Sequence, residues 1–242
     1  MEKSPKPLEK AEFPMRINKY LALHKYSTRR GADKLIEAKQ VYINGKWAKL
    51  GDKVEKNDHV EVKLRNGPMQ YTYLAFNKPK GVVTHSAKEN EEEILDLVPI
   101  KGIFPIGRLD KDSHGLIILT NDGRITERLL GPTFQHEKEY VVSTKETLRT
   151  SFKEKMEAGV KIDDEKTAPC TVKIINDHTF RVTLTEGKKH QIRRMCVALF
   201  QEVSDLQRVR IMNIRIGRLG QGQYREIEGE ELETFLKALE LA

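Results

Sequence analysis

The stretch GRLDKDSHGLIILTNDG, residues 107–123, joins a polar loop to an apolar strand near the middle of a 242-residue chain. The loop carries Asp110, two residues after Arg108, and the apolar run from Leu116 to Leu119 predicts a buried strand. Few features of the neighbouring sequence would solvate an acidic side chain in the loop just before such a strand. Asp110 is therefore a candidate functional residue; the alternative is a surface acid that Arg108 satisfies within a turn.

Strands and helices alternate irregularly on both sides of this stretch. Strand patterns begin at Tyr73 and recur at residues 104–109, 116–120, 139–143, 171–175 and 180–184. Helical patterns cover residues 124–130, 148–158, 191–200 and 230–241. Strand-rich runs with irregularly placed helices favour an α+β fold over a doubly wound parallel sheet.

A smaller set of elements precedes them. Apolar residues at helical spacing predict a helix over residues 15–24, and Ser27 is a candidate N-cap for a second helix. VYINGK, residues 41–46, alternates as a strand and contains the hairpin turn Asn44-Gly45. We therefore predict a mobile tail over residues 1–13, a small domain over 14–63, a linker over 64–72 and a larger domain over 73–242.

Positive charge is concentrated in the small domain. Residues 14–63 hold 12 Lys and Arg against 6 Asp and Glu, so they carry +6 of the chain's formal charge of +7. Because phosphate contacts release condensed counterions, such a basic cluster favours an RNA or DNA partner over a merely solvated lysine-rich surface. The candidate contacts lie on the polar faces of the two predicted helices: Arg16, Lys19, Arg29, Arg30 and Lys34.

Several classes of protein are not supported by the sequence. No apolar run approaches the roughly 20 residues of a membrane span, and the N-terminus has no apolar signal core, so we expect no membrane contact and a cytoplasmic location. Cys170 and Cys196 have neither zinc-ligand nor disulfide-framework spacing. GRLGQG, residues 217–222, does not match the dinucleotide fingerprint, and the seven histidines are dispersed. We therefore expect neither a cofactor nor a metal.

Two sets of motifs resemble known families. RINKYLA, STRRGADKLI and VYINGK, in this order, resemble the S4 RNA-binding domain, whose paired helices contact structured RNA. GRLDKDSHGLIILTNDG, KEY and HQIRRM resemble the pseudouridine synthases of the RsuA/RluB/RluE/RluF family, which modify ribosomal RNA and carry an N-terminal S4 domain. The resemblance covers both predicted domains. It implies a catalytic domain with a mixed, mainly antiparallel sheet flanked by helices.

The resemblance also implies roles for particular residues. Asp110 would be the catalytic nucleophile, and Arg108, Tyr140 and Arg193 would contact the substrate, with Tyr140 stacked on a flipped uracil. Arg193 would pair with Asp110, because a guanidinium favours the charged form of a neighbouring acid. Three routes stay open for Asp110: attack at ribose C1′, addition to C6 of the base, or removal of a sugar proton to give a glycal. Taken alone, Tyr140 also fits a core-facing aromatic and Arg193 a solvated helix face.

Ribosomal RNA is the partner that the resemblance implies, and we expect a monomer to bind it. Ser113, LIILTNDG and RRMC favour a large-subunit target, with a small-subunit target as the alternative and transfer RNA as an additional substrate left open. A catalytically silent ribosome-assembly factor would have lost Asp110, Tyr140 or Arg193, and all three are present. A glycosidase with the same acid would release the base, whereas an isomerase keeps it.

Overall fold

The computed structural model describes residues 13–24, 26–63, 70–131 and 134–241 of the chain. Its contacts divide the chain into two compact units, Met1–Tyr71 with Asp122–Arg124 and Thr72–Asn121 with Ile125–Ala242. The tail predicted over residues 1–13 lies outside the described residues except for Phe13, and so do residues 64–69 of the predicted linker. Within the described part of the chain, no helix is both long and apolar enough to cross a membrane.

Two short helices pack against each other in the first unit. α1 (Ile17–Leu23) and α2 (Arg29–Glu37) each bury one apolar face in a common core. The Thr28 hydroxyl caps α2 by accepting a hydrogen bond from the backbone N–H of Gly31 at 3.0 Å. The prediction of Ser27 as the cap was therefore wrong by one residue, because it is Thr28 that has the extended backbone of an N-cap and the hydroxyl in place.

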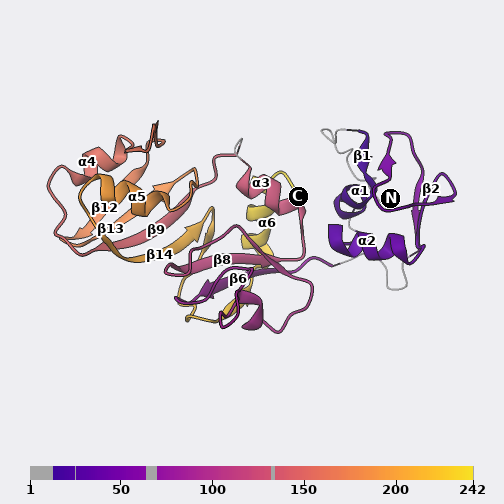
Figure 1. Ribbon diagram of the computed structural model, residues 1–242, viewed down its shortest axis with the longest axis horizontal. Coiled ribbons are helices and arrows are strands. Elements are labelled where there is room, and N and C mark those ends of the chain that lie inside the picture. The colour runs from indigo at the N-terminus through magenta and orange to yellow at the C-terminus, as the bar shows by residue number, and fades with distance from the viewer. Residues whose placement is uncertain (1–12, 25, 64–69, 132–133, 242) are drawn as a thin grey trace. The chain divides into compact units, whose positions relative to one another are not determined.

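Short strands complete the first unit (Figure 1). β1 (Met15–Arg16) pairs with β4 (Lys53–Val54), so the first helix begins two residues later than predicted. β2 (Val41–Ile43) lies between β3 (Lys46–Trp47) and β5 (Val60–Val62). At the turn between β2 and β3, Asn44 and Gly45 have φ values of 50° and 75°, which confirms the predicted Asn-Gly hairpin.

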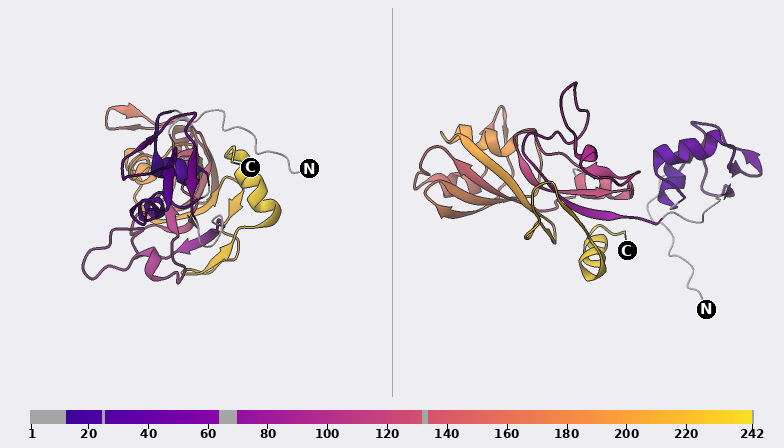
Figure 2. Two further views of the ribbon diagram at one scale, coloured as in Figure 1. Left: turned by 90° about the vertical axis from the view of Figure 1, so that its right-hand side faces the viewer. Right: turned by 90° about the horizontal axis from the view of Figure 1, so that it is seen from below.

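One nine-stranded sheet runs through the described part of the second unit (Figure 1, Figure 2). Its strands are β6 (Tyr73–Lys78), β7 (Phe104–Ile106), β8 (His114–Thr120), β9 (Lys138–Thr144), β12 (Thr171–Asn176), β13 (Thr179–Leu184), β14 (Val203–Ile211), β15 (Ile214–Arg215) and β16 (Tyr224–Glu226). The order across the sheet is β12-β13-β9-β14-β8-β6-β16, with β15 beside β14 and β7 beside β8. β14 and β8 are parallel, whereas the other neighbours in this sheet are antiparallel.

The central strand β14 was not predicted from the sequence. It carries Arg208 and Arg210 where a buried strand is normally apolar. Each guanidinium has an acceptor on another strand: Arg208 Nε donates to the Leu116 carbonyl oxygen (2.7 Å), and Arg210 Nε donates to Glu139 Oε2 (3.0 Å). Because these acceptors are distant in sequence, the local pattern of β14 does not reveal that its charges can be buried.

Helices and connecting segments cover the sheet. α4 (Phe152–Glu157) and α5 (Gln191–Ala198) pack against β9, β12 and β13 (Figure 1). α3 (Arg124–Leu130) has the predicted bounds, whereas α4, α5 and α6 (Gly229–Ala238) are shorter than predicted. α5 ends early because Phe200 has a φ of 61°, in the left-handed region. The predicted α+β fold with a mixed, mainly antiparallel sheet is confirmed.

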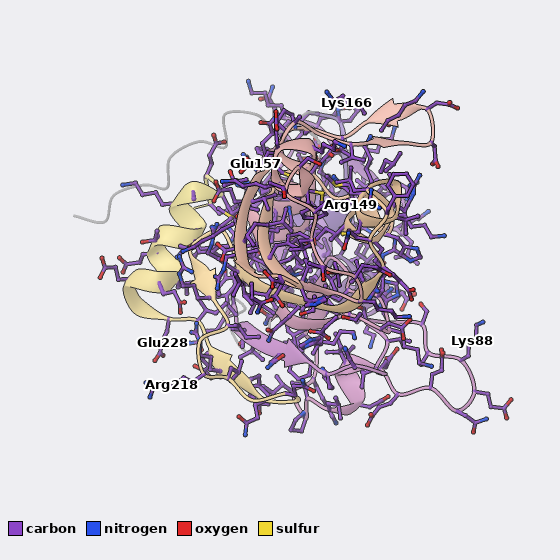
Figure 3. The ribbon with its side chains drawn as sticks, turned by 90° about the vertical axis from the view of Figure 1, so that its left-hand side faces the viewer. Lys88, Arg149, Glu157, Lys166, Arg218 and Glu228 are labelled. Carbon is purple, nitrogen blue, oxygen red and sulfur yellow. The ribbon has the colours of Figure 1, made fainter. Side chains whose placement is uncertain are left out.

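Two segments project from the second unit. The hairpin of β10 (Lys161–Ile162) and β11 (Glu165–Lys166) carries Lys166, and the segment between β6 and β7 carries Lys88 (Figure 3). Both lysines are exposed. Acidic residues accompany both lysines, Asp163, Asp164 and Glu165 in the hairpin and Glu89, Glu91, Glu92 and Glu93 after Lys88, so neither projection is predominantly basic.

Candidate active site

The loop that carries Asp110 is fixed on both sides of this residue. On one side, the Thr84 hydroxyl donates to the Leu109 carbonyl oxygen (2.8 Å) and accepts from the Leu109 N–H (3.1 Å). On the other side, the Ser113 N–H donates to the Asp110 carbonyl oxygen (3.0 Å). Because Thr84, Leu109 and Ser113 are buried, water competes poorly for these hydrogen bonds. The backbone of Asp110 is therefore held in place just before β8.

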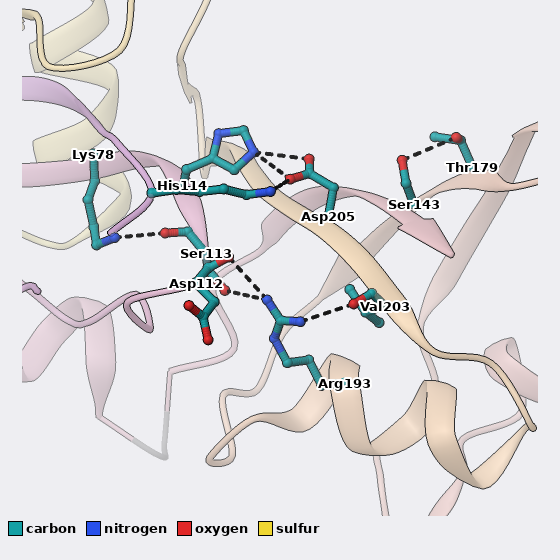
Figure 4. Close-up of polar contacts among 10 residues, drawn as sticks. Lys78, Asp112, Ser113, His114, Ser143, Thr179, Arg193, Val203 and Asp205 are labelled. Carbon is teal, nitrogen blue, oxygen red and sulfur yellow. Dashed lines mark hydrogen bonds and ion pairs between the residues drawn. The ribbon is translucent and has the colours of Figure 1, made fainter. Parts of the chain in front are cut away.

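Lys78, at the end of β6, is a fully buried anchor of this loop. Its Nζ donates to the carbonyl oxygens of Ser113 (2.7 Å) and Pro79 (2.9 Å), as Figure 4 shows for Ser113. Burial lowers the pKa of Lys78 to about 8, although the carboxylates of Asp110 and Asp112 act in the opposite direction. A buried amine thus lies close enough to Asp110 for the two charges to interact.

The carboxylate of Asp110 has a basic neighbour of its own. Asp110 Oδ1 lies 3.3 Å from Nε2 of His190, the residue that precedes α5, and the Asp110 side chain remains 44% exposed. The imidazole offers Asp110 a cationic partner when it is protonated. The exposed part of the carboxylate leaves it accessible to a substrate.

Arg193 contacts the same loop at the residues that follow Asp110. Its guanidinium donates to the Asp112 carbonyl oxygen (3.2 Å), the Ser113 hydroxyl (3.4 Å) and the Val203 carbonyl oxygen (3.3 Å) (Figure 4). This differs from the direct Arg193–Asp110 pair expected from the sequence. His190 takes that position, because Arg193 lies one turn further along α5 and reaches the later part of the loop.

Tyr140 lies on β9, two strands away from the start of β8. It pairs with Arg208 on β14, and Arg208 pairs with Gly115 on β8. Because neighbouring strands are about 4.8 Å apart, the Cα atoms of Tyr140 and Gly115 are separated by about 10 Å. The Tyr140 ring is half-buried against the core beneath α5. Arg108 is exposed on the loop and forms no hydrogen bond or ion pair with the residues that the structure describes.

The parallel strands β8 and β14 approach closely beside the loop. Gly115 has a φ of 105°, and a Cβ atom there would lie 2.3 Å from the Arg208 carbonyl oxygen, so the position requires glycine. The Arg208 side chain is buried, and its Nη2 has no hydrogen-bond partner within the described part of the chain. An incompletely satisfied guanidinium therefore lies next to the segment that positions Asp110.

A second charged cluster ties β14 to the same region. Asp205 Oδ2 lies 3.0 Å from His114 Nε2, and Asp205 also forms an ion pair with Lys80 (Figure 4). Burial raises the pKa of Asp205, but the hydrogen bonds from Lys80 and His114 outweigh burial and hold this pKa below its usual value. The cluster links the start of β8, the middle of the sheet and the turn after β6.

A hollow of about 370 Å³ opens beside α5, next to this region. Its wall includes His190, Arg193 and Arg194 from the start of α5, and Lys161 from β10. Arg194 pairs with Asp163 at the turn of the β10–β11 hairpin. The wall also includes Asp163 and the apolar residues Ile162, Val197 and Ala198, so the basic residues form only one part of it.

Sequence reasoning missed Lys78, His190 and Arg208. Lys78 stands in FNKPKG, in the strand pattern that begins at Tyr73; a lysine within an apolar strand was the available signal, because buried lysines are rare unless paired. His190 lies within the HQIRRM motif, but nothing local indicates that it faces Asp110. Arg208 belongs to the strand that was not predicted.

The predicted RNA contacts lie on the first unit. Arg29, Arg30 and Lys34 are exposed on α2, Arg16 is exposed on β1, and Lys19 is half-buried on α1. Arg29 and Arg30 occupy the first turn of α2, where positive charge opposes the helix dipole and no acid offsets it. A phosphate bound there would be favoured by both guanidinium groups and by the free N–H groups of the first turn.

Two family models match the chain. The model described as RNA pseudouridylate synthase matches residues 72–198, and the S4 domain model matches residues 15–60.

Similar proteins span most of the chain. The dual-specificity RNA pseudouridine synthase RluF of Escherichia coli (strain K12) is 39% identical over 234 residues, which cover 93% of this chain and 80% of that protein. The ribosomal small subunit pseudouridine synthase A of Pasteurella multocida (strain Pm70) is 33% identical over 92% of this chain and 100% of its own length. A solved structure, a crystal structure of pseudouridylate synthase, matches with a TM-score of 0.67 and 27% identity over 93% of this chain and 99% of that chain.

Proposed function

Because the chain belongs to the RNA pseudouridylate synthase family and carries an S4 domain, we propose that it converts uridine to pseudouridine in ribosomal RNA, with Asp110 as nucleophile. The observation that carries the assignment of Asp110 is the contrast within its loop. Buried hydrogen bonds hold the loop backbone, whereas the Asp110 carboxylate stays 44% exposed beside His190. We assign residues 14–63 to RNA binding and residues 73–242 to catalysis.

The reaction asks for a carboxylate in a fixed position. Conversion breaks the bond between uracil N1 and ribose C1′ and rejoins the base through C5, with no net gain of atoms and no redox step. Asp110 acts at C1′, at C6 or on a sugar proton, and each of these routes starts from its ionised form. The imidazole of His190 lies 3.3 Å from this carboxylate, and the buried Lys78 is close enough to interact with it from behind the loop.

The uridine has to leave its helix or loop before Asp110 can reach it. Extrusion of a base costs a few kcal/mol, which contacts elsewhere on the RNA must offset. In this proposal, Tyr140 stacks on the extruded uracil, Arg193 and Arg108 contact the substrate, and Arg16, Lys19, Arg29, Arg30 and Lys34 contact RNA phosphates. The hollow beside α5 supports a path for the RNA close to His190 and Arg193.

Large-subunit ribosomal RNA is the target that we propose. Ser113 and the LIILTNDG and RRMC segments favour it. A small-subunit target is the second candidate, because the relative from Pasteurella multocida is matched over 100% of its length and is named for the small subunit.

Mapping of pseudouridine across ribosomal and transfer RNA, from cells with and without this gene, tests the proposal. We expect at least one large-subunit pseudouridine to disappear without the gene and to return when the gene is restored. Loss restricted to small-subunit RNA would favour the second candidate. Unchanged pseudouridine maps in ribosomal RNA and in transfer RNA would contradict the enzymatic proposal and favour a catalytically silent assembly factor.

A further inference from the structure

The outer face of the small sheet in the first unit carries two aromatic rings. Val41 and Ile43 of β2 pack into the core, so Tyr42 between them faces the other way. Trp47 of β3 pairs with Tyr42 in register, and the two ring centroids are 6.4 Å apart. Trp47 is 56% exposed. Because Trp47 is exposed and Tyr42 is half-buried, the pair forms a partly accessible aromatic surface, which suits stacking of a planar ligand.

A lysine lies over each ring. Lys39 Nζ is 4.7 Å from the centroid of the Trp47 ring, and Lys63 Nζ is 4.7 Å from the centroid of the Tyr42 ring. Their backbones are fixed, because the Lys39 N–H donates to the Ile36 carbonyl oxygen (2.9 Å) and the Lys63 N–H donates to the Gln40 carbonyl oxygen (2.8 Å). The ammonium groups, by contrast, sit on long stems that can reach other partners.

One acid, Glu61, lies near these two lysines, and it does not neutralise both of them. Glu61 is the residue opposite Tyr42 on β5, and its carboxylate is engaged by His59 at 3.2 Å. The face therefore presents two planar rings with an ammonium group beside each.

We propose that Lys39, Tyr42, Trp47 and Lys63 form a binding surface for unpaired nucleotides of the substrate RNA, separate from the basic faces of α1 and α2. The inference rests on the proposed RNA-modifying function. A base that stacks on an aromatic ring gains more than an exposed ammonium over the same ring, so the base can take the ring face. The released ammonium then reaches the phosphate of the same nucleotide.

Unpaired RNA fits this face better than a duplex does. Inside a duplex both faces of each base are covered by neighbouring bases, so a ring of the protein cannot stack on them. Along a single strand, bases and phosphates alternate, which matches two rings that each have a lysine beside them. The arrangement also makes few demands on sequence, because every base has an aromatic face.

Trp47 is the single tryptophan of the chain, so its fluorescence reports on this surface directly. We would titrate the full chain with an eight-nucleotide oligoadenylate and, separately, with a blunt-ended RNA duplex made of two complementary strands. The expected result is saturable quenching of the emission by the oligoadenylate and little quenching by the duplex. Absence of quenching by the oligoadenylate, or equal quenching by the duplex, would overturn the inference.

Variants separate stacking from general attraction. Binding of labelled oligoadenylate should weaken about tenfold for Trp47→Ala and stay close to wild type for Trp47→Phe. Lys39→Gln and Lys63→Gln should each reduce the slope of log affinity against log salt concentration by about 0.7. Leu50→Ala is the control, because Leu50 is 52% exposed on the same unit and is not aromatic. Equal affinities for the Trp47→Ala and Leu50→Ala variants would contradict stacking on Trp47.

The tryptophan quenching tests this surface independently of whether the chain forms pseudouridine. Asp110→Asn should keep the quenching while it loses pseudouridine formation. Normal turnover by Asp110→Asn would refute the proposed nucleophile and leave the tryptophan result intact, whereas missing quenching would refute this surface and leave the nucleophile untouched.

Discussion

Asp110 and His190 lie 3.3 Å apart, carboxylate oxygen to imidazole nitrogen, although they are 80 positions apart in the sequence. His190 is the N-cap residue of α5, and Arg193 follows it by one helical turn. His190 faces Asp110 itself, whereas Arg193 donates to Asp112 and Ser113. The N-terminal end of α5 thus contacts Asp110 through His190, and the next residues of the loop through Arg193.

Replacement of His190 by Gln should slow turnover modestly. Both side chains of the pair are about half exposed, and exposed ion pairs are worth about 0–1 kcal/mol, so we expect kcat to fall by up to about fivefold. Single-turnover kinetics at saturating RNA would measure this change. His178→Gln is the control, since His178 is exposed on the turn between β12 and β13. A 1,000-fold fall in kcat for His190→Gln would be more than the loss of one exposed ion pair explains, and would contradict this modest role of His190.

Replacement of Arg193 by Gln should reduce kcat more strongly. The guanidinium bridges the loop and β14 through three acceptors, and charged hydrogen bonds of this kind are worth about 1.5–3 kcal/mol, which corresponds to about 10- to 100-fold. Arg194→Gln is the matched control, because Arg194 is the next residue on α5 and pairs with Asp163 instead. Equal kcat values for the two variants would contradict the positioning of the loop by Arg193.

Lys78 should make stability depend on pH in the alkaline range. Its pKa is about 8 in the folded chain, below the ordinary value of 10.5, so between these values the unfolded chain binds more protons and folding becomes more favourable as pH rises. The free energy of unfolding of the wild type, relative to Lys78→Met, should therefore increase between about pH 8 and pH 10.5, by at most about 3 kcal/mol.

Urea unfolding at a series of pH values measures this difference. Lys88→Met serves as the control, because Lys88 is exposed on a projecting segment (Figure 3). A difference between wild type and Lys78→Met that stays constant from pH 8 to pH 10.5 would show that burial does not depress the pKa of Lys78.

Gly115→Ala should destabilise the second unit. The φ of 105° disfavours any side chain, and the added Cβ would lie 2.3 Å from a backbone carbonyl oxygen of β14, which cannot move without disturbing the sheet. We expect a loss of about 2–4 kcal/mol in the free energy of unfolding. Gly187→Ala is the control, because no heavy atom lies within 4 Å of a Cβ there, and it should change stability by less than about 0.5 kcal/mol. Similar losses in both variants would contradict the close approach of β8 and β14.

The parts of the fold that depend on local pattern could be predicted from the sequence. The Asn44-Gly45 hairpin and the bounds of α3 follow from residues that are neighbours in the chain. β14 could not be predicted, because its arginines become compatible with a buried strand only through acceptors such as the Leu116 carbonyl oxygen on β8.

In the candidate site, too, the residues in local motifs could be predicted from the sequence, whereas the contacts between distant segments could not. Asp110, Tyr140 and Arg193 stand in recognisable motifs, so their types and order were readable in the sequence. His190 faces Asp110 because of its left-handed backbone and the packing of α5. Neither feature can be predicted from the motif alone. The burial of Lys78 likewise depends on a carbonyl oxygen, that of Ser113, from a different part of the chain.

The most direct test of the account compares Asp110→Asn with Asp112→Asn on a ribosomal RNA substrate. Both variants remove one negative charge from the same exposed loop, but only Asp110 is assigned as the nucleophile. We predict that Asp110→Asn binds RNA with nearly wild-type affinity and forms no pseudouridine, whereas Asp112→Asn keeps turnover within about tenfold of wild type. Pseudouridine formation at the normal rate by Asp110→Asn would contradict the assignment.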